Sequence, residues 1–174
     1  MGKYITMKVA INVLIFMLCI NFYQAQAQCK IASEVNANGT ISQITPEAII
    51  YQKESNTIFS QVRFDGSQYY FIWKVKPIVI DSSKTKNMEV VLDDETNLMF
   101  DFYDTYELAK DSTLNILFYI PNKHLEALKS HGINNINIVT DTGKRNFILV
   151  AHKNEISDQL TCLMKAVSPK KTKE

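Results

Sequence analysis

The sequence predicts a mainly β fold of the α+β kind, an antiparallel β-sheet or β-sandwich of about 7–8 strands with two helices. The helices are expected near residues 122–131 and 155–167. Two observations predict this fold. Apolar and polar residues alternate with a period of two over much of the chain from Ile49 onward, which is typical of strands with one buried face. Short turns, and not helices, join the early strands, so the sheet is expected to be antiparallel.

The clearest strand pair lies in residues 57–77, TIFSQVRFDGSQYYFIWKVKP. Asp65 and Gly66 are expected to form a two-residue turn, because this dipeptide tolerates positive φ angles. Pro77 ends the pair, since proline cannot donate to a sheet ladder. The second strand has a face expected in the core, Tyr69, Phe71, Trp73 and Val75, and an opposite face, Tyr70, Ile72, Lys74 and Lys76.

More strands follow along the chain. Residues 87–104, NMEVVLDDETNLMFDFYD, predict a second hairpin with a turn rich in Asp and Asn. Residues 112–120 are a further alternating stretch, and residues 133–140 and 145–152 predict a strand pair around the turn DTGK. Residues 30–48 are polar and irregular, and their pattern is too weak to predict an element.

Two stretches have helical periodicity. In NKHLEALKSHG, Leu125 and Leu128 share one stripe. Asn122 is expected to cap the N-terminus of this helix, and Gly132 to end it in the left-handed conformation. The C-terminal helix carries an apolar stripe of four residues: Ile156, Leu160, Leu163 and Val167. Cys162 lies beside this stripe, where it could bond to another cysteine without displacing the core face.

Residues 1–27 have the features of a secretory signal peptide. Lys3 and Lys8 form a short basic region. Residues 9–22 are almost entirely apolar and are shorter than a membrane span of about 20 residues. The small residues of AQA predict cleavage after Ala27, and hence a secreted or periplasmic protein.

Two alternatives stay open for this segment: an uncleaved N-terminal anchor helix, and a lipoprotein acylated at Cys29. Gln28 argues against the second, because acylation requires a small residue directly before the cysteine. Cleavage also removes Cys19, which leaves Cys29 and Cys162. In an oxidising compartment these two are expected to form the one possible intrachain disulfide, and the alternative is two free thiols.

After cleavage, residues 28–167 are expected to form a single globular domain, followed by a basic tail at 168–174. The mature chain is close to neutral, whereas residues 28–164 have a net charge of −4. A mildly acidic body predicts no binding of nucleic acid, which needs a basic face. No membrane span is expected after signal cleavage.

The sequence holds few groups arranged for catalysis. His124 and His131 are too far apart for a zinc-binding helix pair, and there is no C-x-x-C motif, nucleophile elbow or glycine-rich phosphate loop. We therefore expect no catalytic residue, no metal site and no cofactor. An alternative is a small hydrolase or metal-dependent enzyme that uses the acidic hairpin 93–104, although hairpin turns collect Asp for their geometry alone. The acidic residues are Asp93, Asp94, Glu95, Asp101 and Asp104.

The aromatic run at residues 69–73 is the remaining candidate for function. Its odd-numbered residues are expected in the core. On the opposite face, Tyr70, Lys74 and Lys76 combine aromatic and basic character, which suits contact with a sugar or a protein partner. These three residues are the predicted binding face.

From Thr57 to Met164 the layout resembles a loosely related set of small secreted proteins from Bacteroidota. Two segments carry the resemblance: YIPNKHLEALKSHGINNINI, and the closing helix ISDQLTCLMKA with its cysteine. The matching apolar positions of the first segment are Ile120, Leu125, Leu128, Ile133, Ile136 and Ile138. The resemblance implies a fold type and export, and it implies no reaction. Short glycosylation patterns also occur at Asn38 (NGT) and at Ser112 and Thr113 (DST), and both arise often by chance.

These observations predict a secreted or periplasmic, non-enzymatic module. It is expected to bind a protein, a glycan or an envelope component through a face or an edge of its sheet. Besides the hydrolase, a second alternative is a secreted inhibitor or immunity-type protein that blocks a partner enzyme.

Overall fold

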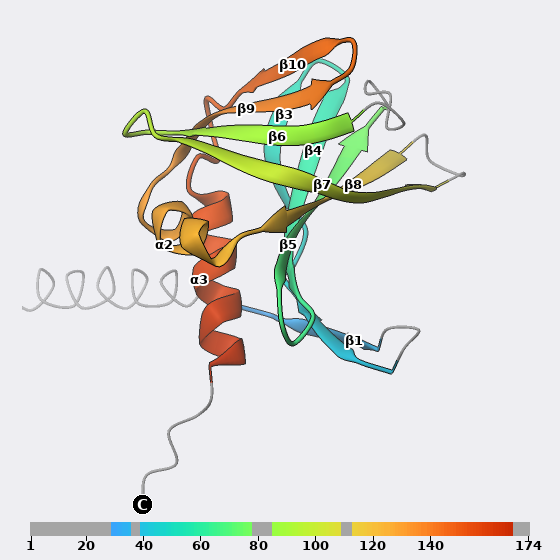
Figure 1. Ribbon diagram of the computed structural model, residues 1–174, viewed down its shortest axis with the longest axis vertical. Coiled ribbons are helices and arrows are strands. Elements are labelled where there is room, and N and C mark those ends of the chain that lie inside the picture. Colours follow the sequence, from blue (N-terminus) through green and yellow to red (C-terminus); the bar gives the residue numbers. More distant parts are fainter. Residues whose placement is uncertain (1–28, 36–38, 78–84, 109–112, 169–174) are drawn as a thin grey trace, which may run out of the picture.

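The computed structural model describes residues 29–35, 39–77, 85–108 and 113–168 (Figure 1), and these residues form ten strands and two helices. The helices are α2 (Asn122–Ser130) and α3 (Glu155–Val167). The strands are β1 (Ala32–Val35), β2 (Ile41–Ile44), β3 (Ala48–Lys53), β4 (Asn56–Phe64), β5 (Tyr69–Lys76), β6 (Thr85–Leu92), β7 (Asn97–Leu108), β8 (Thr113–Ile120), β9 (Ile133–Thr140) and β10 (Gly143–Ile148).

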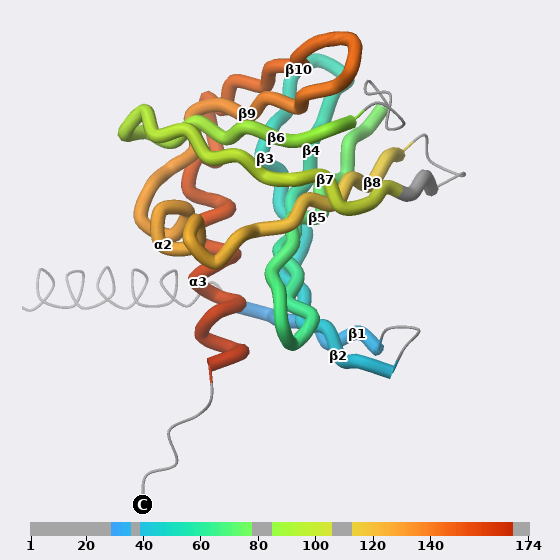
Figure 2. The backbone as a smooth tube through the Cα atoms, viewed as in Figure 1, coloured from blue at the N-terminus to red at the C-terminus, as the bar shows by residue number. Residues whose placement is uncertain are grey.

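All ten strands belong to one antiparallel sheet, in the order β1-β2-β4-β5-β8-β7-β6-β9-β10, with β3 also paired to β4. The long strand β7 pairs first with β6 and then with β8, so the sheet turns at this strand. As a result β4 and β5 run across the direction of β6 and β9 (Figures 1 and 2). The predicted mainly β fold with a short central and a C-terminal helix is confirmed, and the sheet is open.

The strand number exceeds the predicted 7–8 because the N-terminal segment adds the hairpin of β1 and β2. All four residues of β1 are exposed, so no alternation marks it in the sequence. In β2 the pattern is inverted, since Ser42 is buried and Ile41 is exposed. At the other end, β10 stops at Ile148, before the predicted limit of residue 152.

The core fills the inside of the curled sheet. The prediction for β5 is confirmed, since Tyr69, Phe71, Trp73 and Val75 are all buried on the inner face. Both helices close this core through their predicted apolar stripes: Leu125 and Leu128 on α2, and Ile156, Leu160 and Leu163 on α3, with Val167 partly buried. The buried amide of Gln159 on α3 donates to the carbonyl of Ser60 at 2.8 Å, which fixes α3 to the inner face of β4.

Two details of α2 differ from the prediction. The helix begins at Asn122 itself, and no side chain caps it, so the predicted Asn122 cap is wrong. The helix ends with the N–H of His131 donating to Ala127, and Gly132 does not adopt a left-handed φ. Gly132 instead lies at a close approach, because a Cβ there would be 2.8 Å from Oδ1 of Asn154 and 3.3 Å from a carboxylate oxygen of Asp93.

The turn between β4 and β5 is centred one residue later than predicted, on Gly66 and Ser67. The N–H of Asp65 donates to the carbonyl of Gln68 at 3.2 Å, and Gly66 has a φ of 97°. Oδ1 of Asp65 accepts from the N–H groups of Ser67 and Gln68 at 3.0 and 2.9 Å. Asp65 therefore holds the turn through its side chain as well as through its backbone.

Cys29 and Cys162 lie together with their Cα atoms 5.5 Å apart, a separation that suits a disulfide. This pair links the segment before β1 to α3. Of the two helices among the described residues, neither is long and apolar enough to cross a membrane. The predicted signal peptide, and the basic tail beyond residue 168, lie outside the described residues.

Candidate functional site

The predicted binding residues Tyr70, Lys74 and Lys76 share one face of β5, but they do not form one exposed patch. Tyr70 is only 7% exposed, and Nζ of Lys74 forms an ion pair with Glu47 at 2.6 Å. Between them, Ile72 is buried on the same face in a small apolar cluster. Lys76 is exposed at the end of the strand. The structure therefore separates the aromatic from the basic part of this face.

Tyr70 instead lines a small hollow of about 80 Å³ on the outer face of the sheet. The other lining residues come from neighbouring elements: Arg63 from β4, Asp65 from the turn, Tyr103 from β7 and Leu117 from β8. The rings of Tyr70 and Tyr103 lie 5.0 Å apart between centroids, at an interplanar angle of 55°. The hollow thus combines two aromatic rings, a guanidinium and a carboxylate.

A β-bulge places Tyr103 in the hollow. The register between β7 and β8 shifts between Phe102 and Asp104, which leaves Tyr103 as the extra residue. Its side chain is 60% exposed. The sequence contains a signal for this bulge. Leu98, Phe100 and Phe102 are the inward-facing residues of β7, and without a bulge the next inward-facing residue would be the polar Asp104. The bulge turns that polar residue away from the core.

The ionisation states in the hollow follow from burial and hydrogen bonding. Burial, aided by the nearby carboxylate of Asp65, raises the pKa of Tyr70 to about 12. Partial burial alone would raise the pKa of Asp65, but hydrogen bonds from Gln68 and Ser67 outweigh it and lower this pKa. At neutral pH the hollow therefore holds a neutral phenol beside an ionised carboxylate. The hydroxyl of Tyr70 donates to Oε1 of Gln68 at 3.0 Å.

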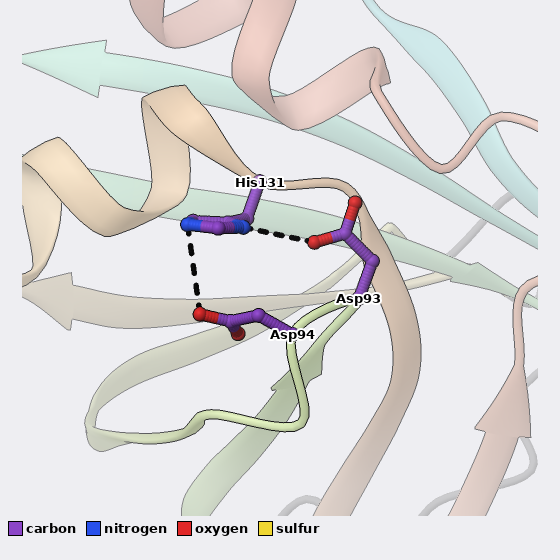
Figure 3. Close-up of side chains that lie close together, drawn as sticks. All are labelled: Asp93, Asp94 and His131. Atoms are coloured by element: carbon purple, nitrogen blue, oxygen red, sulfur yellow. Dashed lines mark hydrogen bonds and ion pairs between the residues drawn. The ribbon is translucent and has the colours of Figure 1, made fainter.

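Two residues of the predicted acidic group, Asp93 and Asp94, lie beside His131 (Figure 3). Nδ1 of His131 is 2.9 Å from a carboxylate oxygen of Asp93, and Nε2 is 3.5 Å from one of Asp94. Asp101 and Asp104 lie elsewhere, on β7, opposite Asn87 and Leu117. In the sequence His131 was considered only as a partner of His124. Its contact with Asp93 and Asp94 was not predicted, because only the tertiary fold brings the end of α2 to the β6–β7 turn.

This group offers three metal-ligand atoms within 4.8 Å of one another. A metal-binding histidine presents one nitrogen to the ion, however, and here the two nitrogens of His131 face different carboxylates. Each nitrogen of His131 thus already has a carboxylate neighbour, and Nδ1 forms a hydrogen bond to Asp93. Asp93 also accepts the N–H of Gly132 at 3.1 Å, so the group joins the β6–β7 turn to the link between α2 and β9.

The group should make stability depend on pH. The hydrogen bonds from His131 and then Gly132 lower the pKa of Asp93 below its ordinary value of 3.8. A lowered folded-state pKa means that the stabilisation is present above the unfolded-state value and is lost as the pH falls through the folded-state value. We expect Asp93→Asn to lower the urea midpoint clearly at about pH 6 and only slightly at about pH 2.

Urea unfolding at the two pH values checks this expectation. Glu95→Gln, in the same turn, controls for the loss of one negative charge. An equal shift of the Asp93→Asn midpoint at both pH values would contradict the ionic role of Asp93.

Strand β3 and the end of β10 line opposite sides of a groove of about 400 Å³. Residues 50–53 line it from β3, and residues 148–152 line it from the end of β10 onward. The rings of Tyr51 and Phe147 meet edge-to-face with centroids 5.2 Å apart, although no backbone pairing joins β3 and β10 in the described sheet. The sequence predicts the strand within residues 145–152, but it does not show that this strand lies close to β3.

The sequence contains two short glycosylation patterns, NGT at Asn38 and DST with Ser112 and Thr113. Thr113 begins β8 and is buried, so its hydroxyl is not available as a surface glycosylation acceptor in the folded chain. Asn38 and Ser112 lie outside the described residues.

In comparisons with known proteins, the chain matches no family model, no curated protein and no solved structure.

Proposed function

We propose that the protein is an exported, non-enzymatic module that binds an extended segment of a partner protein by strand addition at β10. The single observation that carries this proposal is the groove between β3 and β10. There, two strand edges that pair with no other described strand lie beside exposed apolar side chains. Export is supported by the signal-like residues 1–27 and by the paired cysteines, which suit an oxidising compartment.

The backbone of β10 offers bonding groups on its free edge. The N–H of Leu149 donates to the carbonyl of Asn134 at 2.9 Å, which marks a hydrogen-bonded pair. Such pairs alternate along an antiparallel ladder, so Lys144, Asn146 and Ile148 direct their N–H and C=O groups away from β9. An added strand could accept and donate at these positions, as in other proteins that bind peptides by extending a sheet.

The side chains favour a partner other than a second copy. Ile148 and Val150 are 64% and 87% exposed, and they offer apolar contacts to alternate residues of an added strand. Lys144 and Arg145 lie earlier on the same strand. Nζ of Lys144 already pairs with Glu89 at 2.9 Å. An antiparallel pair of two β10 strands centred on Arg145 would bring this cation opposite its own copy, which disfavours that pairing.

A random peptide display library, selected on the wild-type protein, would test the proposal. We expect extended peptides with alternating apolar residues. The double variant Ile148→Asp and Val150→Asp should bind them at least about tenfold more weakly, because it removes two apolar contacts of about 1 kcal/mol or more each. On peptide binding, the amides of β10 that face the free edge should exchange more slowly with deuterium.

The chain offers a matched control at the other end of the sheet. Val35 and Ile41 face each other on β1 and β2 and are 74% and 61% exposed. Changing both to Asp should leave peptide binding unchanged. Loss of binding in this control variant, or unaltered exchange along β10, would place the site elsewhere and overturn the proposal.

An inhibitor or immunity-type protein would use the same edge. In that case the added segment belongs to an enzyme, and the selected peptides would compete with binding to that enzyme.

A further inference from the structure

We propose that the hollow around Tyr70 and Tyr103 is a subsite for a neutral saccharide. It lies on the outer face of β4, β5, β7 and β8, so it is separate from the groove at β10 and does not rest on strand addition. Four features of the hollow carry the proposal: an exposed ring, a fixed polar turn, balanced charge and limited size.

The exposed ring is the first feature. A sugar ring has an apolar C–H face that packs on an aromatic side chain. Tyr103 is 60% exposed, and the bulge in β7 holds it over the hollow beside the ring of Tyr70. Tyr70 is itself braced by Tyr119, whose ring centroid lies 6.2 Å away. The platform is therefore fixed before any ligand arrives, which lowers the entropy that binding must lose.

The fixed polar turn is the second feature. Oδ1 of Asp65 accepts the N–H groups of Ser67 and Gln68, and also the hydroxyl of Ser67 at 2.9 Å. Nε of Arg63 donates to the hydroxyl of Ser42 at 3.0 Å, which holds the guanidinium in place. A carboxylate that accepts and a guanidinium that donates together suit the hydroxyl groups of a sugar, which do both.

Charge and size narrow the ligand further. The lining holds one carboxylate, that of Asp65, and one guanidinium, that of Arg63, so a ligand without net charge suits it best. An engineered protein cavity of about 150 Å³ holds a benzene ring. The hollow has about 80 Å³, so it admits a small group and not a whole sugar ring. A hydroxyl or hydroxymethyl group would enter the hollow, and the ring would lie over Tyr103.

The test is an NMR titration of the isotope-labelled protein with three probes: the methyl glycosides of glucose, galactose and N-acetylglucosamine. We expect saturable shifts of the amides of residues 65–70 and 102–104 for at least one probe, with a dissociation constant on the order of 1 mM. Tyr103→Ala should weaken binding about tenfold, because it removes the stacking surface. Tyr103→Phe keeps the ring and should change affinity less than about twofold.

Met99→Ala is the matched control, since Met99 is also an exposed apolar residue on β7 but lies away from the hollow. Its affinity should equal that of the wild type. Absence of saturable shifts with all three probes would overturn the proposal, and so would equal affinity of Tyr103→Ala and the wild type. N-acetyl-tryptophan amide is the competing probe, and tighter binding of this compound at the same amides would assign the hollow to a peptide side chain instead.

Discussion

Replacing Trp73 with alanine is expected to lower the free energy of unfolding by about 3–5 kcal/mol. Trp73 is fully buried at the centre of β5, between β4 and β8. Its ring packs against those of Phe71 and Phe118, with centroids 6.0 and 5.8 Å away. Alanine would leave a large cavity among these rings, and the neighbouring strands cannot close it without breaking their ladders. Because domains are stable by about 5–15 kcal/mol in total, this loss should remove at least about a fifth of the free energy of unfolding.

Urea unfolding followed by far-UV circular dichroism measures this effect. Fluorescence is unsuitable, because Trp73 is the only tryptophan in the chain. Trp73→Phe is the matched variant, since it keeps an aromatic ring between Phe71 and Phe118 and should cost less than half as much. A loss below about 1 kcal/mol for Trp73→Ala would mean that the core around β5 is not packed as described.

Elements whose pattern is local were predictable from the sequence. In β5 every second residue is large and apolar, and in α3 the apolar stripe recurs at helical spacing, so the buried face follows from the order of residues. The hairpin of β1 and β2 was not predictable from the sequence. Strand β1 is exposed on both faces, and in β2 the polar Ser42 is buried, so neither strand shows the alternation of apolar and polar residues. Its stability comes from the tertiary context, through pairing of β2 with β4.

The candidate sites depend on long-range contacts more than the individual strands and helices do. Tyr70 was identified from its strand face, but its partners Arg63 and Tyr103 come from β4 and β7, which the topology brings together. His131 reaches Asp93 over 38 residues of sequence. Predicting the groove between β3 and β10 would require knowing how strongly the sheet curls. Period-two patterns place side chains on faces, and they carry no information about which edges approach each other.

Replacing both Cys29 and Cys162 with serine is the second change for which we expect a large loss in the free energy of unfolding. Bond formation closes a loop across a sequence separation of 133 residues. A bond over such a loop restricts the unfolded chain strongly, by about 4–5 kcal/mol in the chain-entropy account. The folded state also gains conformational freedom when the bond is absent, because all four residues of β1 are exposed. Ile31, just before β1, still packs against the core and limits this gain. The net loss for the double variant Cys29→Ser and Cys162→Ser should therefore be smaller, about 2–4 kcal/mol.

Two measurements separate bond formation from its effect on stability. Both use a chain that begins at Gln28 and so lacks Cys19. Its intact mass after alkylation should show two added groups only when the protein was reduced first. Urea unfolding should then give the same lowered midpoint for the reduced wild type and for the double variant. Alkylation of both cysteines without reduction would show free thiols in the folded protein. If the bond forms but reduction leaves the midpoint unchanged, the cross-link costs the unfolded chain little entropy, because that chain is already compact. The estimate of about 2–4 kcal/mol rests on an expanded unfolded chain, so this result would contradict it.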